Sequence, residues 1–216
     1  MTRLRLFAWL AASLFTAGTA LSQNVLVNGN FETNPPPNFG NNIGWPITPW
    51  VLGPGQTSNV VKVDGPGGYN YGTNGPESDA SAPGAGIPQH YLDIANGDNY
   101  FYQTFMPRCS GLVTFGGFFS TRANSAGTAR VELHEGSGGP AGPLVGITNP
   151  VSLPAGGHSA TDPWTGTSFT AAVTAFQTYS FVVYMDDNMN FDNGFVTYNN
   201  ECPAPDPCCP PWNSTS

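Results

Sequence analysis

Positively charged side chains are scarce in this sequence. Lysine and arginine number six in 216 residues, against fourteen aspartates and glutamates, and the formal net charge is −8. Beyond residue 22 the strong bases are Lys62, Arg108, Arg122 and Arg130. Nucleic acids and anionic membrane surfaces attract clustered basic residues, which these scattered positions do not supply. The composition therefore excludes a nucleic-acid partner, disfavours a membrane surface, and favours a neutral ligand or a bound cation.

Long hydrophobic runs are also lacking. One apolar stretch opens the chain, where Arg3 and Arg5 precede residues 6–15 and small residues follow as far as Ser22. A membrane helix needs about 20 apolar residues. A shorter run with basic residues before it and small residues after it is typical of a secretory signal peptide. We therefore expect residues 1–22 to be removed and the protein to be secreted, extracellular or at the cell surface, with no membrane insertion.

Helical periodicity is nearly absent. The chain holds 27 glycines and 21 prolines, and its apolar residues rarely recur at helical spacing. Short segments rich in aromatic and β-branched residues predict strands instead. About eight strands with long connections predict an all-β fold, a jelly-roll β-sandwich of two antiparallel sheets. The predicted strands are 24–31, 58–64, 90–94, 100–105, 112–120, 129–134, 178–185 and 191–198.

Several of these segments alternate as half-buried strands do. Val131 and Leu133 share one face of their segment, and Phe181, Val183 and Met185 share one face of another. These apolar faces are predicted to point into the core, with the intervening residues on the outer face. The acidic residues 186–190 lack the glycine and final glutamate of a calcium-binding EF-hand loop, so we predict a hairpin turn there.

The predicted loops are long and rich in turn residues. They cover residues 34–43, 65–88 and 136–168. The second and third are longer than ordinary connections and loops of that length are usually functional or mobile, and long loops at one end of a sandwich commonly carry a binding site. Residues 65–88 contain Tyr69 and Tyr71, which favours function, whereas residues 136–157 contain no aromatic residue and are equally well explained as a surface excursion.

The order of several short motifs resembles that of galactose-binding-like β-sandwich domains, and more narrowly secreted carbohydrate-binding modules and related extracellular domains of unknown function. The motifs are Asn24-Val-Leu-Val-Asn-Gly-Asn-Phe-Glu32, Gly44-Trp45, Trp50, Gln89-His-Tyr-Leu-Asp-Ile94, Tyr102-Gln-Thr-Phe105 and the segment around Asp192. The resemblance implies one domain over residues 23–200, between the signal peptide 1–22 and a tail rich in proline and cysteine at 201–216.

In that family the Glu of the opening motif and an Asp of the last strand commonly bind a structural calcium ion. The resemblance therefore implies Glu32 and Asp192 as calcium ligands. Calcium prefers six to eight hard oxygen ligands, and two carboxylates would balance its charge. The sequence departs from the family pattern after Asp192, because Asn193-Gly194 intervenes before the next apolar residue, Phe195. This departure shifts the predicted register by a residue or two.

The resemblance also implies binding of extracellular carbohydrate. Sugar sites combine aromatic platforms with a few polar partners, because sugars have apolar faces edged by hydroxyl groups. Each candidate aromatic could instead belong to the core, as we predict for Phe115, Phe181 and Phe191. The candidate platforms are Trp50, Tyr69, Tyr71, Trp164 and Tyr184, and the candidate polar partners are Gln103, Arg122 and Asp186.

Catalytic motifs are missing. The three histidines stand in no metal-binding spacing, and no Gly-x-Ser-x-Gly elbow occurs. We therefore predict a non-catalytic binding module. Its main rival is a structural or adhesive surface or matrix protein, which the stiff proline-rich tail would suit. A glycoside-active enzyme is the third alternative, with carboxylates such as Asp186 and Asp187 as acid and nucleophile.

Cysteines are few. Cys109 stands alone, and the other three are Cys202, Cys208 and Cys209 in the tail. In an exported chain four cysteines predict two disulfides with three possible connectivities. We expect Cys109 to pair with one tail cysteine. A second pair, an intermolecular bond and a zinc site without a clear fourth ligand remain alternatives for the others, and the oligomeric state is open.

Overall fold

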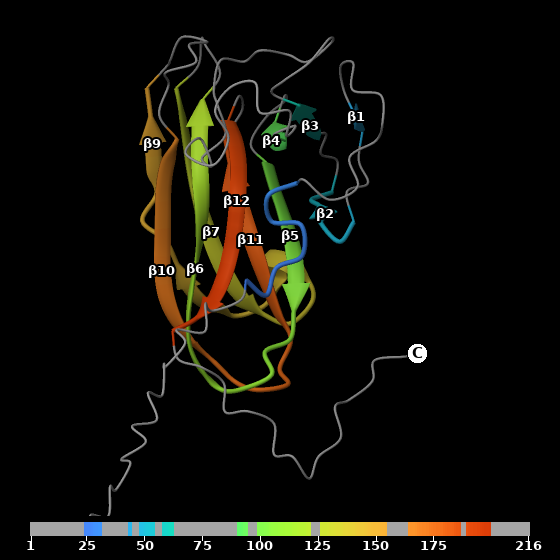
Figure 1. Ribbon diagram of the computed structural model, residues 1–216, viewed down its shortest axis with the longest axis vertical. Helices are drawn as coiled ribbons and strands as arrows, with labels where there is room; N and C mark the ends of the chain where they lie inside the picture. Colours follow the sequence, from blue (N-terminus) through green and yellow to red (C-terminus); the bar gives the residue numbers. More distant parts are fainter. Residues whose placement is uncertain are drawn as a thin grey trace, which may run out of the picture.

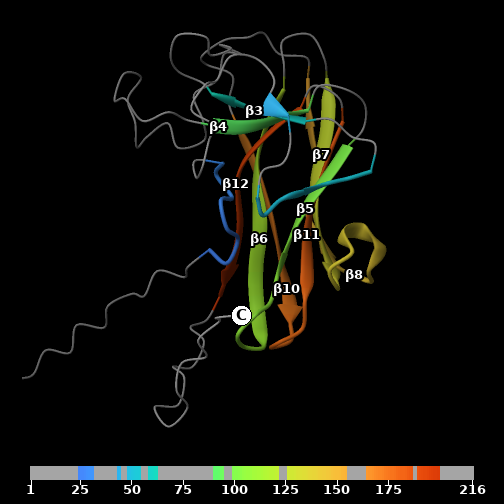
Figure 2. The same cartoon turned by 90° about the vertical axis from the view of Figure 1, so that its right-hand side faces the viewer.

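The computed structural model describes residues 24–31, 43–44, 48–54, 58–62, 90–94, 99–121, 126–154, 164–186 and 189–199. These residues form two antiparallel sheets packed face to face (Figures 1 and 2). The predicted all-β sandwich is therefore confirmed. The predicted signal peptide and tail lie outside the described residues. The part of the chain described here contains no helix long and apolar enough to cross a membrane.

Six strands form the sheet that we call sheet A. Their order across the sheet is β1 (Ile43–Gly44), β3 (Ser58–Lys62), β4 (His90–Ile94), β12 (Met189–Tyr198), β6 (Gly111–Thr121) and β10 (Thr165–Val173). Sheet B has the order β2 (Val51–Leu52), β5 (Asn99–Phe105), β11 (Tyr179–Met185), β7 (Gly127–Glu135) and β8 (Leu144–Ile147). A further strand, β9 (Val151–Leu153), also pairs with β7.

The core lies between the two sheets and is rich in aromatic rings. Phe191 of β12 is fully buried and stands at its centre. Its ring centroid lies 5.2 Å from that of Phe119, 5.4 Å from Phe101 and 6.2 Å from Phe31. The predicted core residues Phe115, Phe181 and Phe191 are all 0% exposed, which confirms them.

The predicted alternation is confirmed in β7 and β11. Val131 and Leu133 of β7 face the core. Phe181, Val183 and Met185 of β11 do the same. The intervening residues therefore lie on the outer face of sheet B, because successive side chains of a strand point to opposite faces.

Most predicted strands are observed with small changes at their ends. The segment 90–94 matches β4 without change. The segments at 100–105, 112–120, 129–134, 178–185 and 191–198 correspond to β5, β6, β7, β11 and β12 within two residues at each end. The segment 58–64 matches β3 as far as Lys62, and residues 63–64 lie outside the described part.

Three predictions about local structure are wrong. Residues 24–31 are bends and turns rather than a strand. The predicted loop 136–168 contains the 3-10 turn η1 (Gly139–Ala141), β8, β9 and the start of β10. These strands escaped prediction because they pair at sheet edges: β10 is exposed along most of its length and so lacks alternation. The segment after Met185 is no hairpin, because β11 belongs to sheet B and β12 to sheet A.

Candidate functional site

Residues 24–31 form a strap that joins the two sheets. On the side of sheet A, the Val25 amide donates to the Val196 carbonyl and the Gly194 amide donates to the Gly29 carbonyl, each at 2.9 Å. On the side of sheet B, the backbone of Val27 is bound by a side chain from β5. In Figure 1 the strap is the blue segment between β12 and β5. The strap therefore links the two sheets across one edge of the sandwich.

Asn24 and Gly29 hold the strap in close contact with β12. The Asn24 Oδ1 atom accepts from the amides of Leu26 at 3.1 Å and Val196 at 2.9 Å, and its Nδ2 donates to the Gly194 carbonyl at 2.9 Å. A Cβ atom on Gly29 would lie only 2.1 Å from the Gly194 oxygen. Only glycine allows this approach of two backbones. The opening and closing motifs of the sequence thus meet in space.

Trp50 and Gln103 hold the strap from the inside. Trp50 is 3% exposed, and its indole N–H donates to the Asn28 carbonyl at 3.0 Å. Gln103 is 2% exposed, and its amide group donates to the Val27 carbonyl at 2.8 Å and accepts from the Val27 amide at 2.7 Å. We therefore assign both residues, candidates for ligand contact by sequence, to the core and the strap.

A β-bulge in β12 redirects the end of that strand. Asp192 pairs with Phe118 of β6 and Phe195 pairs with Gly116, so three steps along β12 match two along β6. An extra residue reverses the alternation of side chains beyond it. Phe195 therefore lies on the outer face of sheet A, and Val196 is fully buried in the core. The bulge accounts for the Asn193-Gly194 interruption in the sequence.

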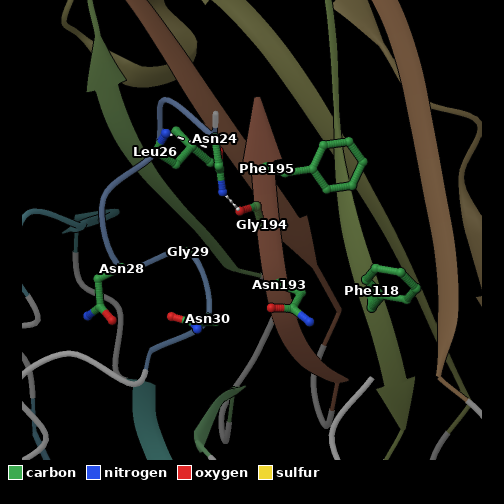
Figure 3. Close-up of a pocket in the computed structure, with 9 residues that line it drawn as sticks. All are labelled: Asn24, Leu26, Asn28, Gly29, Asn30, Phe118, Asn193, Gly194 and Phe195. Atoms are coloured by element: carbon green, nitrogen blue, oxygen red, sulfur yellow. Dashed lines mark hydrogen bonds between the residues drawn. The ribbon is translucent and has the colours of Figure 1, made fainter. Parts of the chain in front are cut away.

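A pocket of about 380 Å³ lies where the strap meets this bulge, and we call it the junction pocket. Figure 3 shows Asn28 and Asn30 on the strap, Asn193 on β12, and the rings of Phe118 and Phe195 on the other side of the β12 ribbon from the strap. None of its described lining residues carries a charge. The lining residues are Asn24, Leu26, Asn28, Gly29, Asn30, Phe118, Asn193, Gly194 and Phe195.

The second surface is a row of three side chains across sheet B, which we call the aromatic row. Tyr184 of β11 pairs with Tyr100 of β5 on one side and with Arg130 of β7 on the other. The two tyrosine rings lie 5.7 Å apart at 47°, and the Arg130 guanidinium carbon lies 4.2 Å from the Tyr184 ring centre. All three residues are half-buried.

Arg130 is fixed by Glu132 and His134. The Arg130 Nε atom donates to Glu132 at 2.6 Å, and the other Glu132 oxygen lies 2.8 Å from His134 Nε2. His134 Nδ1 lies 2.8 Å from the Gly142 carbonyl oxygen. Glu132 is 7% exposed and His134 is 6% exposed. The charged end of the aromatic row is thus locked in place by a buried network.

Residues 136–143 cover the neighbouring part of this sheet face. The Gly139 amide donates to the Ser180 hydroxyl at 3.1 Å, and that hydroxyl donates to the Gly136 carbonyl at 2.7 Å. Gly139 adopts a φ of +62° and packs against the ring of Tyr102, where a Cβ atom would come within 2.9 Å. The aromatic row lies beyond this cover, on the part of the face that remains half exposed.

The pKa of Tyr184 is raised above its ordinary value of 10.0. Partial burial is the largest cause, and the negative charge of Glu132 adds to it, while Arg130 opposes it. The phenol therefore keeps its proton at neutral pH and can donate a hydrogen bond to a ligand.

The remaining candidates from the sequence lie apart from the aromatic row or outside the described residues. Trp164 precedes β10 of sheet A, and its ring stands 5.7 Å from that of Tyr91 at 71°. Asp186 follows β11, and its Oδ2 accepts from the Thr128 amide at 2.7 Å. Tyr69, Tyr71, Arg122 and Glu32 lie outside the described residues.

Cys109 lies between β5 and β6 and is disulfide-bonded. The three tail cysteines, Cys202, Cys208 and Cys209, lie outside the described residues, so the pairing of Cys109 with one of them stays a prediction.

The predicted calcium ligand Asp192 lies on β12 and is 4% exposed. One of its carboxylate oxygens accepts from the Asn193 amide at 2.7 Å. Two residues earlier, Asn190 is fully buried, and its Oδ1 atom has no hydrogen-bond partner in the described structure. Both residues offer hard oxygens, which suit calcium. The described residues contain no group of three or more histidines, cysteines, aspartates or glutamates able to hold a metal ion.

Comparisons with known proteins give similarity in structure alone. No family model matches the chain, and no curated protein matches it in sequence. The carbohydrate-binding module TmCBM61, solved with β-1,4-galactotriose, is similar at a TM-score of 0.46 and 13% identity, covering 82% of this chain and 100% of that one.

Two further solved structures are similar at lower coverage. The enzymatically active domain of bacteriophage CBA120 tailspike protein 4 has a TM-score of 0.45 and 12% identity, covering 81% of this chain and 21% of that one. A carbohydrate-binding module from Cellvibrio mixtus lichenase 5A, solved with cellotriose, has a TM-score of 0.36 and 12% identity, covering 54% of this chain and 83% of that one.

Proposed function

We propose that this protein is a secreted, non-catalytic module that binds carbohydrate through the aromatic row. The observation that carries the proposal is the cross-strand arrangement of Tyr100, Tyr184 and Arg130 on the half-exposed outer face of sheet B. Sugar rings pack their C–H faces on aromatic rings, and their hydroxyl groups exchange hydrogen bonds with polar groups at the rim. The aromatic row supplies both.

The electrostatics of the aromatic row favour an uncharged sugar. The Arg130 side chain is 39% exposed, but its charge is balanced by the Glu132 carboxylate at 2.6 Å. The described hydrogen bonds of the guanidinium involve Nε alone, which leaves its terminal N–H groups as donors for ligand hydroxyls. Because Glu132 and His134 already hold Arg130, little conformational entropy is lost when a ligand binds.

The same network supports a role in binding rather than catalysis. A glycosidase needs a carboxylic acid and a second carboxylate placed on either side of the bond that breaks. At the aromatic row Glu132 is buried and contacts both Arg130 and His134, and apart from the row Asp186 accepts a hydrogen bond from a backbone amide of β7. Both carboxylates serve the scaffold.

Binding to a panel of neutral oligosaccharides, including β-1,4-galactotriose and cellotriose, tests this proposal. We expect at least one sugar to bind in isothermal titration calorimetry, and Tyr100→Ala to weaken that binding about tenfold, which corresponds to about 1.4 kcal/mol. The matched control is Phe176→Gly, which removes a 74% exposed ring from a turn that has positive φ. The proposal fails if no sugar in the panel binds at millimolar protein or if Tyr100→Ala binds as the unchanged protein does.

We also propose a structural calcium ion near Asp192, with Glu32 as a further ligand. The Asp192 carboxylate and the unpartnered Asn190 Oδ1 atom support it, since both would supply hard oxygens from one face of β12. A calcium ion there would fix the strand beside the bulge. We expect EGTA to lower the melting temperature of the unchanged protein and to leave that of Asp192→Asn unaltered. An unchanged melting temperature of the parent protein would dismiss the ion.

A further inference from the structure

The junction pocket differs from every site that the sequence indicated. Its rings come from Phe118 and Phe195, its polar groups are asparagine amides, and it opens on sheet A. Its volume of about 380 Å³ falls within the range of roughly 300–1,000 Å³ for small-molecule sites. The stability of the strap explains Asn24, Gly29 and Gly194, but it does not explain the rings or the Asn193 amide.

Asn193 is the most informative residue of the junction pocket. It is half-buried, and its backbone φ is +49°, a left-handed conformation that asparagine adopts more readily than most residues other than glycine. Its side-chain amide makes no hydrogen bond in the described structure, since the bond to Asp192 involves the backbone N–H. The bulge accounts for the backbone of Asn193, and its side-chain amide is left facing the junction pocket without a hydrogen-bond partner among the described residues.

The two phenylalanine rings form the apolar part of the junction pocket. Phe118 pairs with Gly166 of β10, where a Cβ atom would lie 2.9 Å from the Phe118 ring, so the ring leans over the glycine. Phe195 faces Gly116 across the same sheet, and the bulge alone turns it outward. Both rings are half-buried on the outer face of sheet A. A ring laid flat on a sheet offers its other face to a ligand.

We propose that the junction pocket is a second binding site, for one neutral sugar ring, on the face opposite the aromatic row. Uncharged amides and apolar rings select a neutral ligand that has an apolar face and several hydroxyl groups. This site stands on its own residues. Only its consequence rests on the proposed function: with both surfaces occupied, one protein molecule bridges two carbohydrate chains.

Titration of the full chain followed by NMR tests the pocket directly. The probes are D-galactose, D-glucose, D-mannose and the two trisaccharides named above. We expect the Asn193 side-chain amide signals to shift with at least one probe. Asn193→Gly, which suits the positive φ, and Phe195→Ala should each weaken pocket binding at least fivefold, whereas Phe176→Gly should not. If the Asn193 signals stay fixed up to tens of millimolar sugar, or if both pocket variants bind normally, the proposal is overturned.

The two proposals are separated by variants of one surface at a time. In calorimetry we expect two binding sites per protein molecule, with Tyr100→Ala weakening one of them and Asn193→Gly weakening the other. Beads coated with the bound trisaccharide should agglutinate with the unchanged protein and with neither variant. Loss of all binding in Tyr100→Ala would leave the aromatic row as the sole site and overturn the second one. If Tyr100→Ala leaves sugar binding unchanged while the junction pocket still binds sugar, the proposed function is overturned and the proposal of a second site stands.

Discussion

The aromatic row and the junction pocket lie on opposite outer faces of one sandwich and are built in different ways. The aromatic row follows from the regular register of β5, β11 and β7, which places Tyr100, Tyr184 and Arg130 side by side. The junction pocket depends on irregular backbone: a bulge in β12, a strap without strand structure, and positive φ angles at Asn28, Phe31 and Asn193. A site on regular strands should therefore tolerate single substitutions better than a site whose shape depends on a few residues with irregular backbone.

The aromatic row and the junction pocket rest on the same core. A substitution at the centre of that core should therefore destabilise both surfaces alike. Phe191→Ala removes a fully buried ring that contacts rings from both sheets and from the strap. We expect the free energy of unfolding to fall by about 3–5 kcal/mol in urea denaturation. Phe169→Ala, at an edge strand and 44% exposed, is the control and should cost clearly less. Equal losses would contradict the central place of Phe191.

A substitution in the strap should impair the junction pocket and leave the aromatic row intact. Gly29→Ala brings a Cβ atom against the Gly194 carbonyl, which is backbone and cannot rotate away. We expect a loss of about 1–3 kcal/mol in the free energy of unfolding. Sugar binding should be lost at the junction pocket and kept at the aromatic row. Gly111→Ala is the matched control, because a Cβ atom there meets nothing within 4 Å. A harmless Gly29→Ala would refute the close contact.

Gln103 of sheet B holds the strap by two hydrogen bonds, and their removal should destabilise the protein less than Gly29→Ala does. Gln103→Leu leaves the Val27 N–H and carbonyl without the partners that now lie 2.7 and 2.8 Å away. We expect a loss of about 1–2 kcal/mol and faster hydrogen exchange of the Val27 amide. Exchange of the Val183 amide in β11, beneath the aromatic row, should change only as far as global stability does. Uniform acceleration of both amides would show that the strap and the sheet open together.

The sequence predicted the regular part of this molecule well. Alternation in β7 and β11 and short apolar segments such as β4 depend on local burial, which the residue pattern records. The prediction of a strand at 24–31 is wrong, because the backbone of the strap is held by hydrogen bonds from the side chains of Trp50 and Gln103, which lie far along the chain. Such partners become visible only when the fold is known.

The two candidate sites also differ in how far the sequence predicts them. Tyr184 is a candidate in the sequence because it is aromatic and alternation places it on the outer face, and the same alternation in β7 places Arg130 beside it only when the pairing of β7 with β11 is known. The junction pocket had one signal in the sequence, the Asn193-Gly194 interruption, which indicates the bulge but not the residues brought to it. Phe118 and Phe195 are neighbours because of that bulge and the pairing of β12 with β6. Bulge geometry and cross-strand partners depend on the whole sheet.

The smallest expected effect concerns the charge balance of the aromatic row. Since the pKa of Tyr184 is raised above 10.0 in the folded protein, the unfolded chain loses this proton first as the pH rises. The contribution of Tyr184 to stability is therefore complete below pH 10.0 and is lost as the pH climbs through the folded pKa. Glu132→Gln removes a negative charge that raises this pKa, so we expect ultraviolet titration to show Tyr184 ionising at lower pH in that variant. Tyr184→Phe identifies the signal. An unchanged titration in Glu132→Gln would mean that burial alone sets the pKa, and that the aromatic row does not sense the charge of Glu132.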